Sequence, residues 1–220
     1  EDTAATVGGG RGNAALTKYS VIAGGYSDTV YGVYGSVLSG YLNQAGAAAE
    51  DTAATVGGGR GNAALTRYSV IAGGCADTVK AIFGAVLSGY QNVAGDSASD
   101  TAAVVSGGMN NRATAKYATV GGGVDNVADG RWSTVGGGWE NEAIGIYNTV
   151  AGGAHNSNTG LMSTIGGGVS NTVAGSGAVI CGGSANTADS GTAAICGGTT
   201  NTVSGRCGFI GGGDENQVTG

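Results

Sequence analysis

Few side chains in this sequence could take part in chemistry, and their spacing builds no recognisable reactive group. His155 is the only histidine, and no Ser or Cys lies where the sequence would pair with it as a nucleophile. The four cysteines include no Cys-x-x-Cys pair, which argues against a zinc site. The 15 acidic residues are spread along the chain without an obvious acid–base pair. We therefore expect a protein that is not an enzyme and uses no metal or cofactor.

Glycine-rich segments are the other candidates for chemistry. The run Gly-Gly-Gly-Arg-Gly-Asn begins at Gly8 and again at Gly57, but no Lys-Ser or Lys-Thr pair follows it and no helix is predicted beside it, so a phosphate loop is disfavoured. Acids follow glycines at Asp125 and Glu215, but this position changes from unit to unit, unlike the acids of calcium-binding nonapeptide repeats. We interpret these segments as surface turns, with occasional calcium contact as the alternative.

The composition excludes several broad classes of protein. With 48 glycines, no proline, 6% aromatic and 11% charged residues, the chain cannot fill a conventional globular core. Its 41% hydrophobic content is too high for a disordered chain, and glycine lacks the three-residue period of collagen. The net charge is −6 and the nine basic residues are scattered, so no nucleic-acid partner is expected. No apolar run approaches the roughly 20 residues of a membrane span, so this segment is not expected to insert into a membrane.

An internal repeat determines the expected fold. Residues 1–49 recur almost unchanged from Glu50, and a shorter unit of 15 residues runs through the whole chain. Each unit has one Val or Ile that we call its anchor, and consecutive anchors lie 15 residues apart except for two intervals of 19. The sequence predicts a single repeat domain over residues 1–220, with about fourteen coils, two four-residue insertions, and a place in a longer fibre. The anchors are Val7, Ile22, Val37, Val56, Ile71, Val86, Val105, Val120, Val135, Val150, Ile165, Ile180, Ile195 and Ile210.

The columns of this repeat predict short strands separated by tight turns. Every anchor is β-branched, and every unit has glycine three residues later, where a turn with positive φ would close the coil. Fifteen residues cannot bury a core alone, but coils stacked about 4.8 Å apart bury a continuous one. We predict an all-β fold, a parallel β-solenoid with two short strands in each coil. Its core of Gly, Ala and Val is thin, which favours self-association.

A column of Asn and Asp lies six residues after the anchors. Side chains of this kind, repeated in every coil, can form hydrogen bonds along the stack and satisfy the backbone of the turns. We predict that they point inward as a structural Asx ladder, with the two Asp tolerated only near backbone N–H groups. The Asx ladder comprises Asn13, Asp28, Asn43, Asn62, Asp77, Asn92, Asn111, Asn126, Asn141, Asn156, Asn171, Asn186, Asn201 and Asn216.

Two further columns carry large, mostly aromatic side chains. The pre-anchor aromatic column lies three residues before the anchors, on the strand face opposite to theirs, and comprises Tyr19, Tyr34, Tyr68, Phe83, Tyr117, Trp132, Tyr147 and Met162. We expect a stacked ladder, buried between protomers or under a loop, with a glycan or other ligand surface as the alternative. The post-anchor aromatic column, four residues after the anchors, is expected to be exposed and free to contact a partner. It comprises Tyr26, Tyr41, Tyr90 and Trp139.

Two of the cysteines occupy one column in successive units. Cys181 and Cys196 each follow their anchor directly. In stacked coils their Cα atoms would lie about 4.8 Å apart, within the range of a disulfide. The sequence leaves two interpretations open: a disulfide between coils, or two reduced thiols that fill a small corner.

The segments Ser133–Gly136 and Asn141–Gly145 show the repeat most clearly. They resemble the YadA-like, or Hep/Hag-type, repeats in the head domains of trimeric autotransporter adhesins, and the resemblance covers the whole chain. It implies a left-handed parallel β-roll, a homotrimer, and display on a cell surface for attachment. The third glycine and the Asn column depart from the family pattern, and related repeats also occur in phage tail fibres.

The sequence therefore predicts an extracellular adhesin head or surface fibre that attaches to host cells, matrix proteins or glycans. The main alternative is a self-assembling filament or phage tail-fibre segment without dedicated adhesion. An ice-binding solenoid is a remoter alternative, suggested by a column of Thr directly before the anchors. Other residues interrupt this column, as at Val21, Ala85 and Phe209, which disfavours ice binding. A solenoid polysaccharide lyase would need wider coils and clustered acids.

Overall fold

The computed structural model describes residues 4–220 and shows a parallel β-solenoid of about fourteen coils, with roughly 15 residues in each coil. The regular elements among these residues are strands, and none is a helix. The predicted all-β solenoid is thus confirmed. Contacts within the chain separate two units, the first ending at Asn111 and the second running over Arg112–Gly220. Each unit is described by itself.

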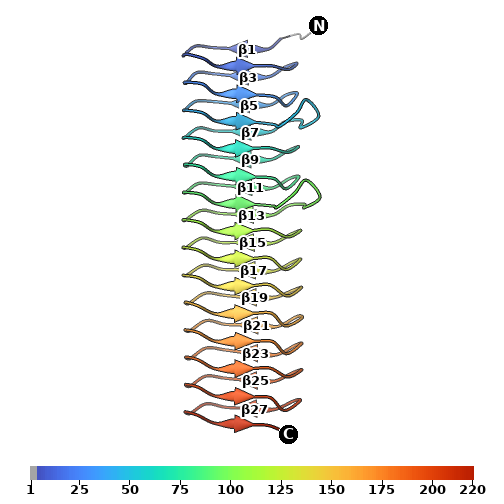
Figure 1. Ribbon diagram of the computed structural model, residues 1–220, viewed down its shortest axis with the longest axis vertical. Coiled ribbons are helices and arrows are strands. Elements are labelled where there is room, and N and C mark those ends of the chain that lie inside the picture. The colour runs from blue at the N-terminus through green and yellow to red at the C-terminus, as the bar shows by residue number, and fades with distance from the viewer. Residues whose placement is uncertain (1–3) are drawn as a thin grey trace. The chain divides into compact units, whose positions relative to one another are not determined.

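The first unit consists of two parallel ladders of two-residue strands (Figure 1). Its odd-numbered strands pair in chain order and are β1 (Thr6–Val7), β3 (Val21–Ile22), β5 (Ser36–Val37), β7 (Thr55–Val56), β9 (Val70–Ile71), β11 (Ala85–Val86) and β13 (Val104–Val105). Its even-numbered strands form the second ladder and are β2 (Ala14–Ala15), β4 (Thr29–Val30), β6 (Gln44–Ala45), β8 (Ala63–Ala64), β10 (Thr78–Val79) and β12 (Val93–Ala94).

The second unit repeats this arrangement in green to red in Figure 1. Its odd-numbered strands are β15 (Thr119–Val120), β17 (Thr134–Val135), β19 (Thr149–Val150), β21 (Thr164–Ile165), β23 (Val179–Ile180), β25 (Ala194–Ile195) and β27 (Phe209–Ile210). Its even-numbered strands are β14 (Arg112–Ala113), β16 (Val127–Ala128), β18 (Glu142–Ala143), β20 (Ser157–Asn158), β22 (Thr172–Val173), β24 (Thr187–Ala188), β26 (Thr202–Val203) and β28 (Gln217–Val218).

Each strand directs one side chain outward and one into the core. Between β17 and β19, Thr134 lies beside Thr149 on the outer face, and Val135 lies beside Val150 on the inner face. The anchors from Ile22 onward are buried, and so are the inward residues of the even-numbered strands from β4 to β26, which are Ala or Val except for Asn158 of β20. The core of each unit is therefore a row of Val and Ile against a row of Ala and Val. Such small side chains let the two ladders lie close together.

Three positions of the repeat have positive φ in each coil, and only one of them is always glycine. The glycine three residues after the anchor has φ between 90° and 125° in every coil. Residues five after and three before the anchor are also left-handed, as at Glu140 (φ 51°) and Trp132 (φ 58°). The prediction that the pre-anchor aromatic column lies on a strand face is therefore wrong. Each odd-numbered strand has only two residues and begins after that column, because the chain must turn within 15 residues.

Glycine is required in the turns for two different reasons. Gly153 has φ 94°, and a Cβ on it would meet the carbonyl oxygen of Gly168 and, at 2.7 Å, Nδ2 of Asn156. Gly145, ten residues after its anchor, does not have positive φ, but a Cβ there would run into the carbonyl oxygen of Gly160. At such positions the backbones of successive coils touch, so any larger side chain would separate them.

The Asx ladder lies inside the turns and links successive coils. Its members from Asp28 to Asn201 are buried, whereas Asn13 and Asn216 near the two ends are more exposed. In the second unit, Nδ2 of Asn156 donates to the carbonyl oxygens of Gly152 at 3.1 Å and Gly168 at 3.0 Å. The first of these acceptors lies in its own coil and the second in the next coil. The amide thus provides a donor for the Gly152 carbonyl and a second donor for the Gly168 carbonyl, which also accepts the backbone N–H of Ala154.

The two four-residue insertions form the wider loops of the first unit (Figure 1). In the first loop, Oδ2 of Asp51 accepts the backbone N–H groups of Ala47 at 3.0 Å and Ala48 at 2.9 Å. Asp100 closes the second loop in the same way. Asp51 and Asp100 therefore cap local turns.

Candidate functional site

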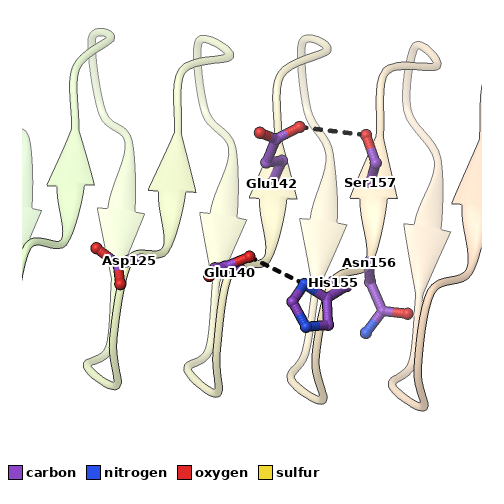
Figure 2. A pocket seen from close by; sticks show the side chains of 6 residues that line it. All are labelled: Asp125, Glu140, Glu142, His155, Asn156 and Ser157. Carbon is purple, nitrogen blue, oxygen red and sulfur yellow. Dashed lines mark hydrogen bonds and ion pairs between the residues drawn. The ribbon is translucent and has the colours of Figure 1, made fainter.

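An acidic pocket lies on the second unit, where three successive coils carry charged residues at one turn. Asp125, Glu140 and His155 each lie five residues after their anchor and each has positive φ. Because the coils stack in register, this 15-residue spacing brings the three side chains next to one another (Figure 2). The turn conformation that the coil imposes is therefore what assembles the pocket.

The acidic pocket is a hollow of about 300 Å³ with a polar lining. Glu142 and Ser157 enter it as the outward residues of β18 and β20, and Asn156 enters it from the Asx ladder. Figure 2 shows the strand residues on one side and the turn residues on the other. The lining comprises Asp125, Glu140, Glu142, His155, Asn156 and Ser157.

Two polar contacts and one aromatic contact hold these side chains in place. Nδ1 of His155 lies 3.0 Å from Oε2 of Glu140, and Ser157 Oγ donates to Oε2 of Glu142 at 3.4 Å. Both are drawn as dashed lines in Figure 2. The indole of Trp139 lies 4.5 Å from the imidazole of His155, between ring centroids, at an angle of 60°. His155 is thus held between an acid and an aromatic ring.

Chemically, the acidic pocket can attract a positively charged group. Three carboxyl groups accompany one histidine, and clustered like charges concentrate the electrostatic potential of a concave surface. The partner of His155 is Glu140 and not Ser157, so the serine is not placed for activation by the histidine. Over residues 4–220, no three His, Cys, Asp or Glu side chains are grouped so as to hold a metal ion.

The sequence analysis did not single out this pocket. The acids that follow glycines, Asp125 among them, are interpreted there as parts of surface turns, and His155 is expected to lack a nucleophilic partner. The signal that could have found the pocket is their 15-residue spacing, which places three ionisable side chains in consecutive coils. Sequence spacing alone does not show how far a turn residue leans toward its neighbours.

The pre-anchor aromatic column of the first unit forms two stacked pairs. The rings of Tyr19 and Tyr34 lie 4.9 Å apart, and those of Tyr68 and Phe83 lie 5.0 Å apart, with 3° between the planes in both pairs. Ala53, which follows the first insertion and occupies the same turn position, separates the pairs. All four rings are exposed in the single chain.

In the second unit the same column forms a run of three rings. Trp132 stacks on Tyr117 at 5.7 Å and on Tyr147 at 4.6 Å, with planes within 6° of parallel. The guanidinium of Arg131 lies 5.3 Å from the Trp132 ring centroid. Met162 follows in the next coil and is exposed. Because its neighbours cover both faces of Trp132, this stack presents ring edges rather than open faces to a partner.

The post-anchor aromatic column is exposed, and part of it is stacked with arginines. Tyr26 and Tyr41 lie 5.3 Å apart at 19°. Arg11 lies 5.7 Å from the Tyr26 ring, and Arg60 lies 5.7 Å from the Tyr41 ring. Tyr90, in the same column of the first unit, is also exposed. The column therefore offers amphipathic rings and positive charge on one surface of the first unit.

The cysteine pair consists of two free thiols. Cys181 and Cys196 lie in successive coils, directly after the paired strands β23 and β25, and both are exposed. The thiols are free, as one of the two interpretations has it, but because both are exposed they do not fill a small corner. One residue after a buried anchor, the alternation of the chain directs the side chain outward.

No protein-family model matches the chain, and no curated protein matches its sequence. Within residues 4–220, no helix is long and apolar enough to cross a membrane.

Proposed function

We propose that this chain is part of a non-enzymatic extracellular surface fibre, an adhesin head of the kind that its repeats resemble, which attaches through the turns of its coils. The observation that carries the proposal is the exposure of the two aromatic columns along the turns. Aligned and exposed aromatic side chains are typical of surfaces that bind a partner.

The contrast between buried and exposed columns supports the same proposal. Anchors are Val or Ile in every coil, and the Asx ladder admits only Asn and Asp. The turn position five residues after the anchor instead holds residues as different as Leu42, Glu140 and His155. A scaffold with constant inner columns and varied turns suits the presentation of different contact groups at regular spacing.

Binding of the purified protein to immobilised glycans, matrix proteins and whole cells tests adhesion. The double variant Tyr26→Ala/Tyr41→Ala and the single variant Trp139→Ala remove exposed rings without touching the core. Thr199→Ala is the matched control, because Thr199 lies in the same column and is also exposed. We expect weaker binding for the ring variants than for the control. Equal binding of all variants, or no binding by the wild type, contradicts the proposal.

A self-assembling extracellular filament, or a phage tail-fibre segment, is the second candidate. Ile146, Tyr147, Leu161 and Met162 are large apolar residues exposed on two successive turns of the second unit. Burial of such a patch between copies would enlarge the thin core. Analytical ultracentrifugation separates the possibilities: a discrete trimer supports the adhesin head, growing polymers support the filament, and a stable monomer contradicts both.

Ice binding, the remoter candidate, has one observation in its favour. Thr119, Thr134, Thr149 and Thr164 are paired in register along β15 to β21 and form an unbroken outward row. Thermal hysteresis at micromolar protein concentration would support this candidate over adhesion. Its absence would leave the row as part of an ordinary solvated sheet face.

A further inference from the structure

Two rungs of the Asx ladder in the first unit carry carboxyl groups instead of amides. Asp28 and Asp77 occupy the same place in the two copies of the 49-residue block, and both are fully buried. Oδ1 of Asp77 accepts the backbone N–H of Asn92 at 2.8 Å and its Nδ2 at 3.0 Å. Oδ2 of each Asp is buried and has no hydrogen-bond partner. One half of each carboxyl group is therefore unsatisfied.

Oδ2 of Asp77 lies where Asn residues of the Asx ladder have Nδ2, which is a hydrogen-bond donor. Nδ2 of Asn92 donates to the carbonyl oxygen of Gly108 at 3.0 Å. A Cβ built on Gly89 would meet this Nδ2, and a Cβ built on Gly74 would meet Oδ2 of Asp77 in the same way. The Gly89 carbonyl oxygen, which accepts hydrogen bonds but cannot donate them, lies beside this place together with the Gly89 backbone nitrogen, and Oδ2 of Asp77 has no hydrogen bond from either.

An ionised carboxylate does not suit this environment. A buried charge without a donor at one oxygen loses its hydration and gains nothing in return. A neutral carboxylic acid carries one proton, which can be donated to a carbonyl oxygen where an amide would donate two. Burial raises the pKa of Asp77 above its ordinary value, although the hydrogen bonds from Asn92 act in the opposite direction.

We propose that Asp77 is a neutral carboxylic acid whose Oδ2–H donates to a turn carbonyl. Protonation of Asp77 then adds a link within the first unit, namely this hydrogen bond. Asp28 has the same contacts and the same unpartnered oxygen. This inference does not depend on the proposed function. It adds a response to pH that the amide rungs cannot provide.

No other charged group faces the two carboxyl groups in the part of the chain that the structure describes. The neighbouring coils contribute amide rungs, and the titratable side chains nearest in sequence lie in the post-anchor position on the outside of the turns. None of them forms an ion pair with Asp28 or Asp77. They are Arg11, Tyr26 and Tyr41 around Asp28, and Arg60, Cys75 and Tyr90 around Asp77.

The sign of the effect follows from linkage. The folded chain holds the proton more tightly than the unfolded chain, so the link stabilises the fold fully below the pKa of an unfolded Asp. This contribution is lost as the pH rises through the higher pKa of Asp77 in the folded chain. We therefore expect the first unit to become less stable from acidic toward neutral pH.

Thermal unfolding between about pH 4 and pH 8 tests the proposal with three variants. Asp77→Asn replaces the acid by an amide rung, Asp28→Asn/Asp77→Asn replaces both, and Asp96→Asn is the control, because Asp96 is exposed in the same unit. We expect Asp77→Asn to raise the midpoint at the upper pH by about 2 °C or more and to flatten its pH dependence. The double variant should be at least as flat, whereas the control should follow the wild type. A wild-type pH dependence in Asp77→Asn overturns the proposal.

A direct measurement on the wild-type protein needs no variant to fold. Carbon NMR of the assigned side-chain carboxyl groups follows the titration of Asp77 and of the exposed Asp96 in one sample. We expect the Asp77 carboxyl to lose its proton at a higher pH than the Asp96 carboxyl. Titration of Asp77 together with Asp96, or below it, overturns the proposal.

Discussion

The side-chain oxygen of Asn141 accepts two hydrogen bonds from Asn156 in the next coil, at 3.1 Å from the backbone nitrogen and 3.0 Å from Nδ2. Nδ2 of Asn141 in turn donates to the carbonyl oxygens of Gly137 at 3.0 Å and Gly153 at 2.8 Å. One side chain therefore joins the turn of its own coil to that of the next. Because the core is thin, we expect these links to contribute a large share of the stability of each turn.

Replacing Asn141 by Leu should destabilise the second unit by about 2–4 kcal/mol, because several buried groups lose their partner and the narrow interior is overfilled. Glu142→Ala is the matched control, since Glu142 is the next residue and points outward. It should cost less than about 0.5 kcal/mol. Chemical denaturation followed by circular dichroism measures both. Equal losses would mean that the Asx ladder does not hold the coils together.

Two adjacent glycines should respond differently to substitution by alanine. Gly153→Ala should be strongly destabilising, because φ is 94° and the new Cβ would lie 2.7 Å from Nδ2 of Asn156 and against the Gly168 carbonyl. At Gly152 the nearest atom to a new Cβ is 3.8 Å away, so Gly152→Ala should be tolerated. Melting temperatures of the two variants decide the matter. A larger loss for Gly152→Ala would contradict this account of the turn.

Trp132→Ala should destabilise the second unit by about 1–2 kcal/mol, because Trp132 stacks on a ring on each side. Trp139→Ala should cost less, since the Trp139 ring lies against one ring, that of His155, at a tilt of 60°. Both residues are partly exposed, so the comparison isolates the effect of the stack. Unfolding curves of the two variants provide the measurement. If Trp139→Ala costs as much as Trp132→Ala, the stack does not stabilise the fold.

A buried polar cluster replaces small and apolar side chains at one place in the second unit. Ser163 Oγ lies 3.1 Å from Oδ1 of Asn148 and 2.5 Å from Oδ1 of Asn158, and Nδ2 of Asn148 donates to the Asn158 carbonyl at 2.8 Å. Asn148→Ala and Asn158→Ala should each cost about 1–3 kcal/mol, because each leaves buried groups with fewer partners. The double variant should cost less than the sum of the two. Additive losses in denaturation experiments would show that the side chains act independently.

The thiols of the second unit should react readily with an alkylating agent in the absence of reductant. Cys181, Cys196 and Cys207 are exposed, whereas Cys75 is half-buried. We expect the three exposed cysteines to be modified first and Cys75 more slowly. Mass spectrometry of peptides from the native protein identifies the modified residues. Protection of both Cys181 and Cys196 that is removed by reductant would show that they form a disulfide.

The repeat in the sequence was sufficient to predict the coils. A spacing of 15 residues between β-branched anchors places like residues side by side, and only parallel stacking buries such a row. Glycine three residues after the anchor and Asn six residues after it mark the turn in the same way. These features are determined locally and repeat in every coil, so one sequence is enough to recognise them.

Tertiary structure alone decided where the side chains of the turns lie. The left-handed conformation of Trp132 and Glu140 follows from closing a coil around strands of two residues, and neither residue type indicates it. The acidic pocket depends on how far Glu140 and His155 lean toward each other across coils. The unpartnered oxygen of Asp77 depends on carbonyl groups of two coils that meet only after stacking. Periodicity determines which residues are neighbours, whereas the closed turns determine which of their atoms meet.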